Sequence, residues 1–150
     1  MNKNQLYLRK ATMDDADILF EWVNDKITRQ SAFDSHIISY DEHIAWFSKL
    51  LNDTERAQYI LMLDDKPLGQ IRLDIEGVIA EIDYSICRSE RGKGYGNVMI
   101  ELIKKQVHTD FPLVRRLIGR VKPSNKASYN CFISNGFEET FRQMEFVLER

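Results

Sequence analysis

Apolar and polar residues alternate along several stretches of the chain, which is the pattern of half-buried β-strands. Leu6 and Leu8, for example, alternate with a tyrosine and an arginine. The alternation predicts strands at about residues 5–10, 58–63, 68–75, 78–86 and 116–121, and one or two closing strands within 137–149. Turn sequences at 64–67 (DDKP) and 76–77 (EG) separate the second, third and fourth strands, so we expect these three to form an antiparallel meander.

Apolar residues at helical spacing predict helices between these strands, at about residues 12–24, 39–51, 93–109 and 125–134. Capping residues mark two of the starts, because Thr12–Asp15 and Ser39–Glu42 both resemble capping boxes. Asn135-Gly136 is a pair that commonly ends a helix. His43 falls in the first turn of the second helix, where we expect a surface or capping-region side chain.

The resulting order, β-α-α-β-β-β-α-β-α-β with room for one more strand, favours an α/β protein of the α+β mixed-sheet type, with helices on both faces of the sheet. The 150 residues have the length of one domain. No repeat, low-complexity tract or linker rich in proline and glycine divides them. We therefore expect residues 1–150 to form a single domain.

Charge and composition exclude several classes of protein. A net charge of −2 argues against a nucleic-acid partner, since such proteins usually carry a basic excess. No apolar run is long enough to cross a bilayer, and the N-terminal residues lack the apolar core of a signal peptide. Cys87 and Cys131 are too few for a disulfide framework or a zinc site, so we expect no metal. These features predict a cytoplasmic protein with reduced thiols and no membrane partner.

Three glycines, Gly92, Gly94 and Gly96, lie in the segment RGKGYG between a predicted strand and a predicted helix. Glycine permits backbone conformations closed to other residues, and a helix N-terminus presents free N–H groups to anions, most commonly phosphate. The P-loop pattern needs a hydroxyl residue after its lysine, but Lys93 is followed by glycine. The dinucleotide pattern G-x-G-x-x-G also fails, because the spacing is G-x-G-x-G and several predicted strands precede it.

Arg91, Gly94 and Gly96 instead carry the pattern [Q/R]-x-x-G-x-[G/A], which resembles the acetyl-CoA signature of the GNAT family of N-acetyltransferases. The order of elements around the loop, ending in a short helix and the sequence NGF, is similar to that family over nearly the whole chain. The resemblance implies the GNAT acyl-CoA N-acyltransferase fold, with a central, mostly antiparallel sheet. It also implies direct transfer of the acetyl group from acetyl-CoA to a primary amine.

The resemblance, together with the physics of phosphate binding, predicts how the chain holds acetyl-CoA. The amides of residues 92–96 and the helix dipole would bind the pyrophosphate. The pantetheine arm carries amides of its own and would pair with exposed backbone of residues 86–88, which requires the fourth strand to splay away from the fifth. The predicted cosubstrate residues are Ile86, Cys87, Arg88, Arg91, Gly92, Lys93, Gly94, Tyr95, Gly96, Asn125, Ser128 and Phe132.

Acetyl transfer also needs a base that takes the proton of the ammonium group. Glu81 and Asp83 are two residues apart in a predicted strand, so they share one face with Ser85. Several similar proteins carry their base near the position of Glu81, which favours Glu81 as the base and keeps Asp83 as the alternative. Both carboxylates could equally be solvated residues on a half-exposed sheet.

The departing thiolate needs an acid. Many members of the family place a tyrosine seven residues after an asparagine, but Phe132 holds that position after Asn125. The segment NKAS resembles the ribosomal-protein acetyltransferase branch, in which a serine lies near the sulfur. It implies Ser128 as the acid, with Tyr129 as the alternative.

The resemblance implies that the acceptor substrate is a small-molecule amine. The segments WVND and EHIAWF, with GQIRLD, resemble acetyltransferases of nucleotide-linked amino sugars, as in pseudaminic-acid and dideoxy-sugar pathways. An aromatic ring can stack on a sugar and an arginine can bind a phosphate, so we expect Trp22, Arg29 and Arg72 to bind the acceptor. The alternatives are a protein N-terminal acetyltransferase of the ribosomal type and a non-catalytic acyl-CoA-binding sensor. A homodimer is a possible assembly.

Overall fold

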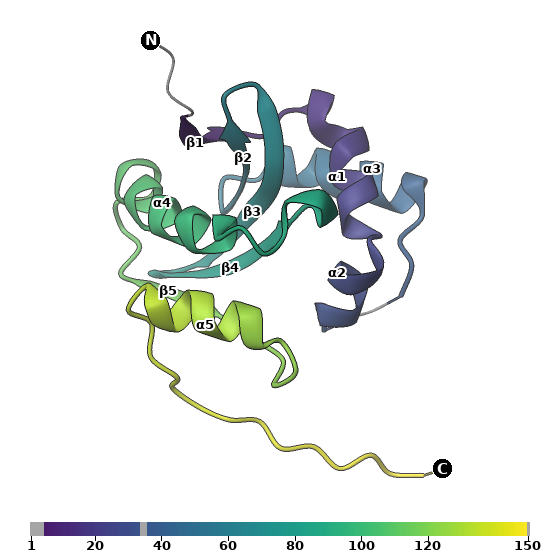
Figure 1. Ribbon diagram of the computed structural model, residues 1–150, viewed down its shortest axis with the longest axis vertical. Helices are drawn as coiled ribbons and strands as arrows, with labels where there is room; N and C mark the ends of the chain where they lie inside the picture. Colours follow the sequence, from purple (N-terminus) through teal and green to yellow (C-terminus); the bar gives the residue numbers. More distant parts are fainter. Residues whose placement is uncertain (1–4, 34–35, 150) are drawn as a thin grey trace.

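The computed structural model describes residues 5–33 and 36–149 and shows, within them, a sheet with helices on both faces (Figure 1). The strands lie side by side in chain order: β1 Leu6–Lys10, β2 Arg56–Leu63, β3 Lys66–Glu76, β4 Ile79–Ile86 and β5 Arg116–Gly119. The α-helices are α1 Ala16–Val23, α2 Lys26–Ser31, α3 Tyr40–Leu51, α4 Tyr95–Asp110 and α5 Lys126–Ser134. In the described part of the chain, no helix has both the length and the apolar character needed to span a membrane.

The sheet is mixed, as the sequence predicts. Strands β1 to β4 pair antiparallel, whereas β4 and β5 pair parallel. The parallel pairing is short, because it begins at Ile79 with Arg116 and ends at Ile82 with Gly119. Strand β4 continues to Ile86 beyond that point, so its last residues extend past the end of β5.

One core fills the space between the sheet and the helices α4 and α5. Met99, Ile100 and Ile103 of α4 are fully buried against the strands. Phe132 of α5 joins the same core and lies so close to Gly119 that a Cβ atom there would overlap the phenyl ring. Helix α5 can therefore pack on β5 only because residue 119 has no side chain.

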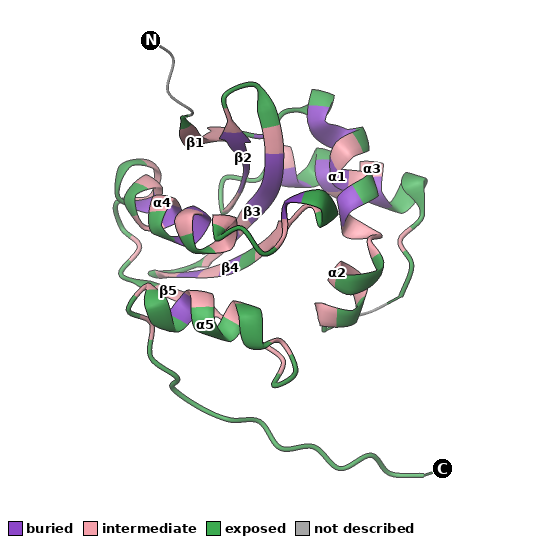
Figure 2. Ribbon diagram, in the orientation of Figure 1, coloured by how far each residue is buried: buried purple, intermediate pink, exposed green. Residues whose placement is uncertain are grey.

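A second core lies on the other face, under α1 and α3, where Leu19, Trp22 and Phe47 pack against the sheet (Figure 2). The expectation for His43 is wrong, because this side chain is buried. Its ring stacks on Phe47, and its Nε2 atom lies 2.9 Å from the carbonyl oxygen of Ala16. A carbonyl can only accept, so Nε2 carries the proton and donates it. Burial lowers the pKa of His43.

The two predicted capping sequences both mark helix starts. The hydroxyl of Ser39 accepts a hydrogen bond from the amide of Glu42 and caps α3. At the first site, the carboxylate of Asp15 accepts from the amide of Thr12, and a 3-10 turn at Met13–Asp15 leads into α1. Arg9 of β1 also donates to Asp15 at 2.8 Å, so this turn is tied to the sheet.

The structure departs from the predicted elements at two places. The short helix α2 forms where a loop is expected, and none of its residues is buried. Residues 137–149 hold no strand, although the alternation predicts one or two. They run as an extended, exposed segment away from α5 (Figures 1 and 2) and do not pair with the outer edge of β5, the last strand of the sheet in the described residues.

Candidate active site

The glycine loop connects β4 to the first turn of α4. Gly92 and Gly94 have φ angles of 78° and 85°, in the left-handed region that favours glycine, and Gly94 is the N-cap of α4. A Cβ atom at either residue would meet nothing within 4 Å, so backbone conformation rather than crowding requires glycine there. The loop therefore presents the free amides of α4 to an open space, where an anion can bind.

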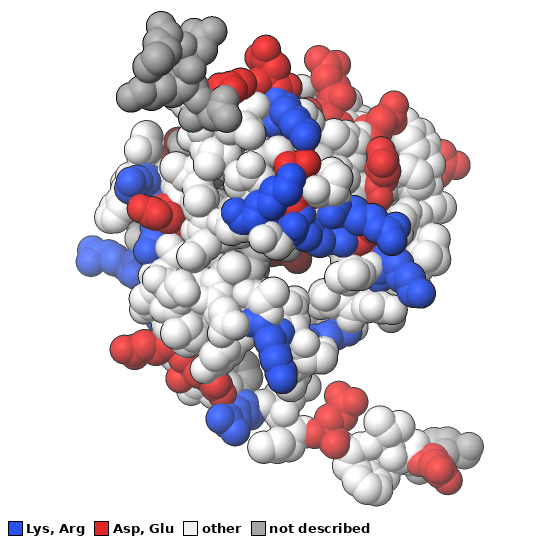
Figure 3. Space-filling view, viewed as in Figure 1, with Lys and Arg blue, Asp and Glu red and all other residues white. Residues whose placement is uncertain are grey.

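The charged side chains of the loop form a network around Glu90, which is buried. Lys66 donates to its carboxylate at 3.0 Å and Lys93 at 3.3 Å. These hydrogen bonds lower the pKa of Glu90. The network holds two lysines at the loop, and Figure 3 shows basic side chains gathered over the segment between β4 and α4.

Arg91 points away from the open space above the loop. Its Nε atom donates to the carbonyl oxygen of Ile86 at 3.0 Å, and its Nη2 atom donates to the carboxylate of Asp25 at 2.8 Å. Asp25 is also the N-cap of α2, where it accepts from the amides of Ile27 and Thr28. Burial opposes its charge, but these hydrogen bonds outweigh burial and lower the pKa of Asp25. Arg91 thus joins the glycine loop to α2.

Beyond the end of β5, one edge of β4 is open. The amide of Cys87 donates to Leu68 of β3 at 2.8 Å. Because hydrogen-bonded residues alternate along an antiparallel pair, the backbone groups of Tyr84 and Ile86 face the other side, where β5 has already ended. An extended chain with its own amides can pair with this edge, and Figure 3 shows the molecule hollowed beside it.

The face of β4 opposite the α4 core carries Glu81 and Asp83. Arg120 donates to the carboxylate of Glu81 at 2.9 Å. The guanidinium of Arg72 lies 3.7 Å from the carboxylate of Asp83. The guanidinium of Arg72 also lies over the ring of Trp46, 5.1 Å from its centroid. Trp46 belongs to the segment EHIAWF, which carries the resemblance to amino-sugar acetyltransferases. The structure places its partly exposed ring among these charged groups.

Tyr84 is a residue that sequence reasoning missed. Strand alternation predicts that its ring faces the core, and the ring does pack edge-on against Phe132. Its hydroxyl nevertheless reaches α5 and donates to Oγ of Ser128 at 2.9 Å. Burial raises the pKa of Tyr84, which keeps the phenol protonated at neutral pH. The sequence did offer one indication, because a tyrosine hydroxyl at a core-facing position of β4 needs a hydrogen-bond partner inside the protein.

The remaining predicted residues occupy varied surroundings. Asn125 caps α5 by accepting from the amide of Ser128 at 3.1 Å, and Tyr129 is exposed on the same helix. Phe132 and Trp22 are buried in the first and second cores. Arg29 of α2 donates to the carbonyl oxygen of His36 at 3.4 Å.

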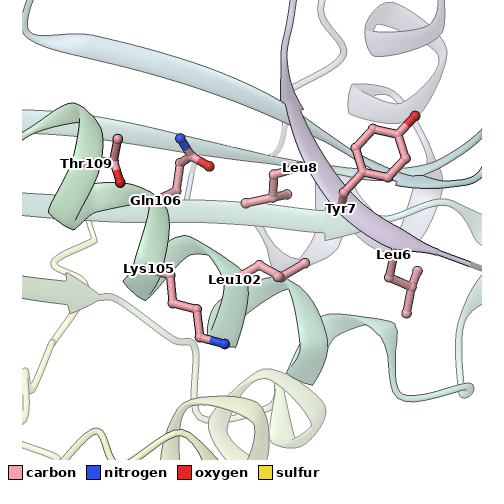
Figure 4. Close-up of a pocket in the computed structure, with 7 residues that line it drawn as sticks. All are labelled: Leu6, Tyr7, Leu8, Leu102, Lys105, Gln106 and Thr109. Atoms are coloured by element: carbon pink, nitrogen blue, oxygen red, sulfur yellow. The ribbon is translucent and has the colours of Figure 1, made fainter.

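Two cavities lie away from this site. One of about 260 Å³ separates β1 from α4, and Leu8 and Gln106 are among its lining residues (Figure 4). Another of about 550 Å³ lies near the C-terminal ends of α3 and α4. None of the predicted site residues lines either cavity.

Comparison with known proteins identifies the fold and the family signature. The family described as "Acetyltransferase (GNAT) domain" matches residues 5–138 of the chain. No protein with a curated description matches the sequence.

Several solved structures share the fold. Spermidine N-acetyltransferase from Vibrio cholerae, in complex with CoA and spermine, has a TM-score of 0.85 at 19% identity, with 97% of this chain and 88% of that chain covered. Aminoglycoside acetyltransferase AAC(6')-Ib in complex with coenzyme A has a TM-score of 0.78 at 21% identity, with 91% and 86% covered. A domain from Methanocaldococcus jannaschii has a TM-score of 0.82 at 19% identity, with 95% and 94% covered.

Proposed function

The chain belongs to the GNAT family of acetyl-CoA-dependent N-acetyltransferases, and from this premise we propose that it acetylates the primary amine of a nucleotide-linked amino sugar by direct transfer. The observation that carries the choice of acceptor is the position of Arg72. Its guanidinium lies over Trp46 and beside Asp83, on the same face as Glu81. An aromatic ring, a cation for a phosphate and two carboxylates for an amine thus lie together.

The proposed cosubstrate site uses the loop and the open edge of β4. The amides of residues 92–96 would bind the pyrophosphate of acetyl-CoA, aided by the positive end of the α4 dipole and by Lys93. The sequence predicts pairing of the pantetheine amides with residues 86–88, but the amide of Cys87 already donates to β3. The pantetheine amides would instead pair with the backbone of Tyr84 and the amide of Ile86, which face the side on which β5 has ended. Arg91 would act indirectly, by holding the carbonyl oxygen of Ile86 and the N-cap of α2.

The proposed base is Glu81. Its carboxylate would take a proton from the acceptor ammonium group, directly or through a water, so that the neutral amine can attack the thioester carbonyl. Arg120 forms an ion pair with this carboxylate in the structure. The Arg120 side chain is 56% exposed, so it can move aside when an ammonium group binds. Asp83 remains the alternative, since it lies on the same face one pleat repeat closer to the loop.

The proposed acid is Ser128, supported by Tyr84. As the C–N bond forms and the C–S bond breaks, the departing thiolate needs a proton, which the Ser128 hydroxyl can supply. Tyr84 donates to Oγ of Ser128 at 2.9 Å, so the phenol can pass its own proton to the serine oxygen when the serine proton moves to the thiolate. A buried phenol with a raised pKa holds its proton at neutral pH until the serine oxygen becomes anionic.

The charge near the acceptor face supports an anionic small molecule over a basic one. Arg56 and Arg72 both lie over the ring of Trp46, at 5.3 and 5.1 Å from its centroid. Arg120 and Lys122 border the same region from the segment after β5, where they contact Phe33 and the carbonyl oxygen of Gln30. Three of these four cations pair with the carboxylates of Asp74, Asp83 and Glu81, so one positive charge is in excess. An anionic acceptor gains more from this excess than a polyamine or a basic N-terminal peptide does.

A panel of acceptors tests the proposal. Release of free CoA thiol would be measured with acetyl-CoA and one of four acceptors: a nucleotide-linked amino sugar, the same amino sugar without its nucleotide, spermidine, or an N-terminal peptide of a ribosomal protein. We expect the highest kcat/KM for the nucleotide-linked sugar and a large loss without the nucleotide. Turnover on the peptide or on spermidine, with none on any amino sugar, would reverse the choice of acceptor.

The Arg72→Ala variant connects that result to the site. If Arg72 binds the phosphate of the acceptor, its loss should raise KM for the nucleotide-linked sugar and leave KM for the free sugar unchanged. Arg142→Ala is the matched control, because Arg142 lies in the exposed segment after α5 and pairs there with Glu139. Equal effects of Arg72→Ala on both sugars would contradict the assigned role.

A further inference from the structure

A row of polar side chains crosses the sheet on the face that carries Asp83. Nε2 of Gln58 in β2 donates to Oε1 of Gln70 in β3 at 2.8 Å, and Nε2 of Gln70 donates to Oγ of Ser85 in β4 at 3.2 Å. Gln70 and Ser85 lie directly opposite each other in the register of β3 and β4. Ser85 is two residues from Asp83, so both side chains share one face. We call Gln58, Gln70 and Ser85 the polar row.

The stability of the fold does not explain the two glutamines of the polar row. Gln58 is 7% exposed and Gln70 is 8% exposed, although Ile60 and Met62 on the same face belong to an apolar core. Within the described residues, Oε1 of Gln58 has no hydrogen-bond partner. Burying an amide oxygen without a partner is unfavourable, and an apolar side chain would pack there at no such cost. A polar row in this position therefore indicates a function.

The polar row fixes the direction of its last hydrogen bond. Gln70 accepts from Gln58 through Oε1, so the group that it presents to Ser85 is the donor Nε2. Oγ of Ser85 therefore accepts, and its own hydroxyl proton remains to be donated elsewhere. In the described part of the chain, no other side chain or carbonyl takes this proton in a hydrogen bond. The row thus ends in a hydrogen-bond donor that is held ready for a ligand.

Ser85 lies where the proposed reaction would take place. The backbone of Tyr84 and the amide of Ile86, on either side of it in the strand, face the open edge with which pantetheine would pair. The side chain of Ser85 instead lies on the acceptor face, with its Cα atom about 7 Å along the strand from that of Asp83. An amine that attacks the thioester from this face would have the Ser85 hydroxyl beside it.

The free proton of Ser85 restricts the chemistry of its partner. An ammonium group carries donors only, so it cannot accept this proton. The neutral amine has one lone pair, which it needs for the attack on the thioester. The partner on the acceptor must therefore be an oxygen atom close to the amine. In an amino sugar, a hydroxyl on the carbon next to the amine-bearing carbon is such an oxygen.

We propose that Ser85 donates a hydrogen bond to an acceptor oxygen on the carbon next to the amine-bearing carbon. Gln70 and Gln58 act as positioning residues that keep the Ser85 hydroxyl directed at this oxygen. The inference deepens the proposed function and rests on it, because it names the group of the amino sugar that the site recognises beside the amine. It would also select against simple alkylamines, which have no oxygen at this place.

Two acceptors that differ by one oxygen test the proposal. We would measure kcat/KM for a nucleotide-linked amino sugar with a hydroxyl next to the amine-bearing carbon and for its analogue without that hydroxyl. The wild type should prefer the first by about 3–10-fold, the scale of one hydrogen bond. Ser85→Ala should lose this preference, and Ser85→Thr, which keeps a hydroxyl, should retain it.

Two outcomes of this measurement would overturn the proposal. One is an unchanged preference in Ser85→Ala. The other is an equal fall in kcat for both acceptors with the preference intact, which would assign the Ser85 hydroxyl to the thioester carbonyl oxygen instead.

A double variant tests the positioning residues. Gln58→Leu combined with Gln70→Leu removes both buried amides, so none is left unpaired and the variant should keep its fold. Its preference between the two acceptors should fall toward that of Ser85→Ala, while KM for acetyl-CoA stays unchanged. Gln106→Leu is the matched control, because this glutamine donates to Asp110 within α4 and should leave the preference intact. A full preference in the double variant would show that the glutamines do not position Ser85.

Failure of the proposed function would give a different result. If the wild type acetylates an N-terminal peptide and no amino sugar, the proposed acceptor is wrong. The first carbonyl oxygen of the peptide then holds the same place relative to the amine. Ser85→Ala should in that case remove the preference for the peptide over an amine that lacks this carbonyl, and a retained preference would overturn the inference. Turnover of spermidine alone would overturn both, since spermidine contains no oxygen.

Discussion

At the scale of single residues, Glu81 and Asp83 share a face of β4 but differ in their neighbours. Glu81 is bonded to Arg120 and stands where β4 still pairs with β5, whereas Asp83 lies just past the end of that pairing. If Glu81 is the base, Glu81→Gln should lower kcat by about 10²–10⁴-fold at neutral pH, the usual contribution of general-base catalysis. The defect should shrink as pH rises, because free amine then forms without a base.

Asp83→Asn is the internal control for this prediction, and calorimetry should show that neither variant changes acetyl-CoA affinity. A normal rate for Glu81→Gln with a large loss for Asp83→Asn would transfer the role to Asp83. If both variants keep the wild-type rate, the base is neither of these carboxylates.

His43 predicts a dependence of stability on pH. Its pKa is lowered in the folded protein, so below the ordinary value of 6.5 the unfolded chain binds more protons than the folded one. The stability is therefore complete above pH 6.5 and is lost as pH falls from there toward the folded pKa. His43→Gln keeps an N–H donor for Ala16 but does not titrate. Urea unfolding at pH 7.5 and 5.5 should show a smaller loss of stability for this variant than for the wild type.

At the scale of elements, α2 depends on polar contacts for its position. None of its residues is buried, and Arg91 holds its N-cap residue Asp25. Asp25→Asn keeps a good capping side chain but removes the ion pair, whose partners are both partly buried. We expect faster hydrogen exchange in α2 and a loss of about 1.5–3 kcal/mol in the free energy of unfolding, the scale of a hydrogen bond to a charged group.

If α2 lies along the acceptor site, Asp25→Asn should raise KM for the acceptor more than the dissociation constant of acetyl-CoA. Asp17→Asn is a suitable control, since it makes the same change on α1, where Asp17 accepts from the exposed hydroxyl of Tyr40. Equal exchange rates in α2 for the wild type and Asp25→Asn would show that Arg91 does not position this helix.

At the scale of the whole molecule, acetyl-CoA should stabilise the fold by binding several elements at once. The proposed site touches the loop, β4 and α5, and Arg91 connects it to α2. Ligand at 100 times its dissociation constant stabilises a folded protein by about 2.7 kcal/mol. For a chain of this length that corresponds to a rise in Tm of roughly 5–10 °C, which differential scanning fluorimetry would detect.

Gly94→Glu is the control for that measurement. It places a charged side chain on a residue with φ of 85°, at the point where the loop would meet the pyrophosphate. Its Tm without ligand should be somewhat lower, because the backbone is strained, and should rise little with acetyl-CoA. A full rise in this variant would place the cosubstrate away from the loop.

Local patterns by themselves determined most of the elements. Alternation predicted the five strands, and Ser39 and Thr12 marked helix starts, because hydrogen bonds within a few residues decide both. The glycine loop was predictable for the same reason, since a positive φ at Gly94 is a property of one residue and its neighbours. The family resemblance carried by that loop is confirmed over residues 5–138.

Only the tertiary structure decided where distant side chains meet. Sequence placed Arg91 among the cosubstrate residues, but its guanidinium joins Asp25, which lies 66 positions earlier in the chain. Tyr84 and Ser128, 44 positions apart, form the polar pair beside the open edge of β4. Such pairs depend on how helices pack across the sheet, and no local pattern encodes that packing. The same reason applies to the missing strand after α5: alternation is a local pattern, but pairing with the edge of β5 depends on the path that the chain takes in the tertiary structure.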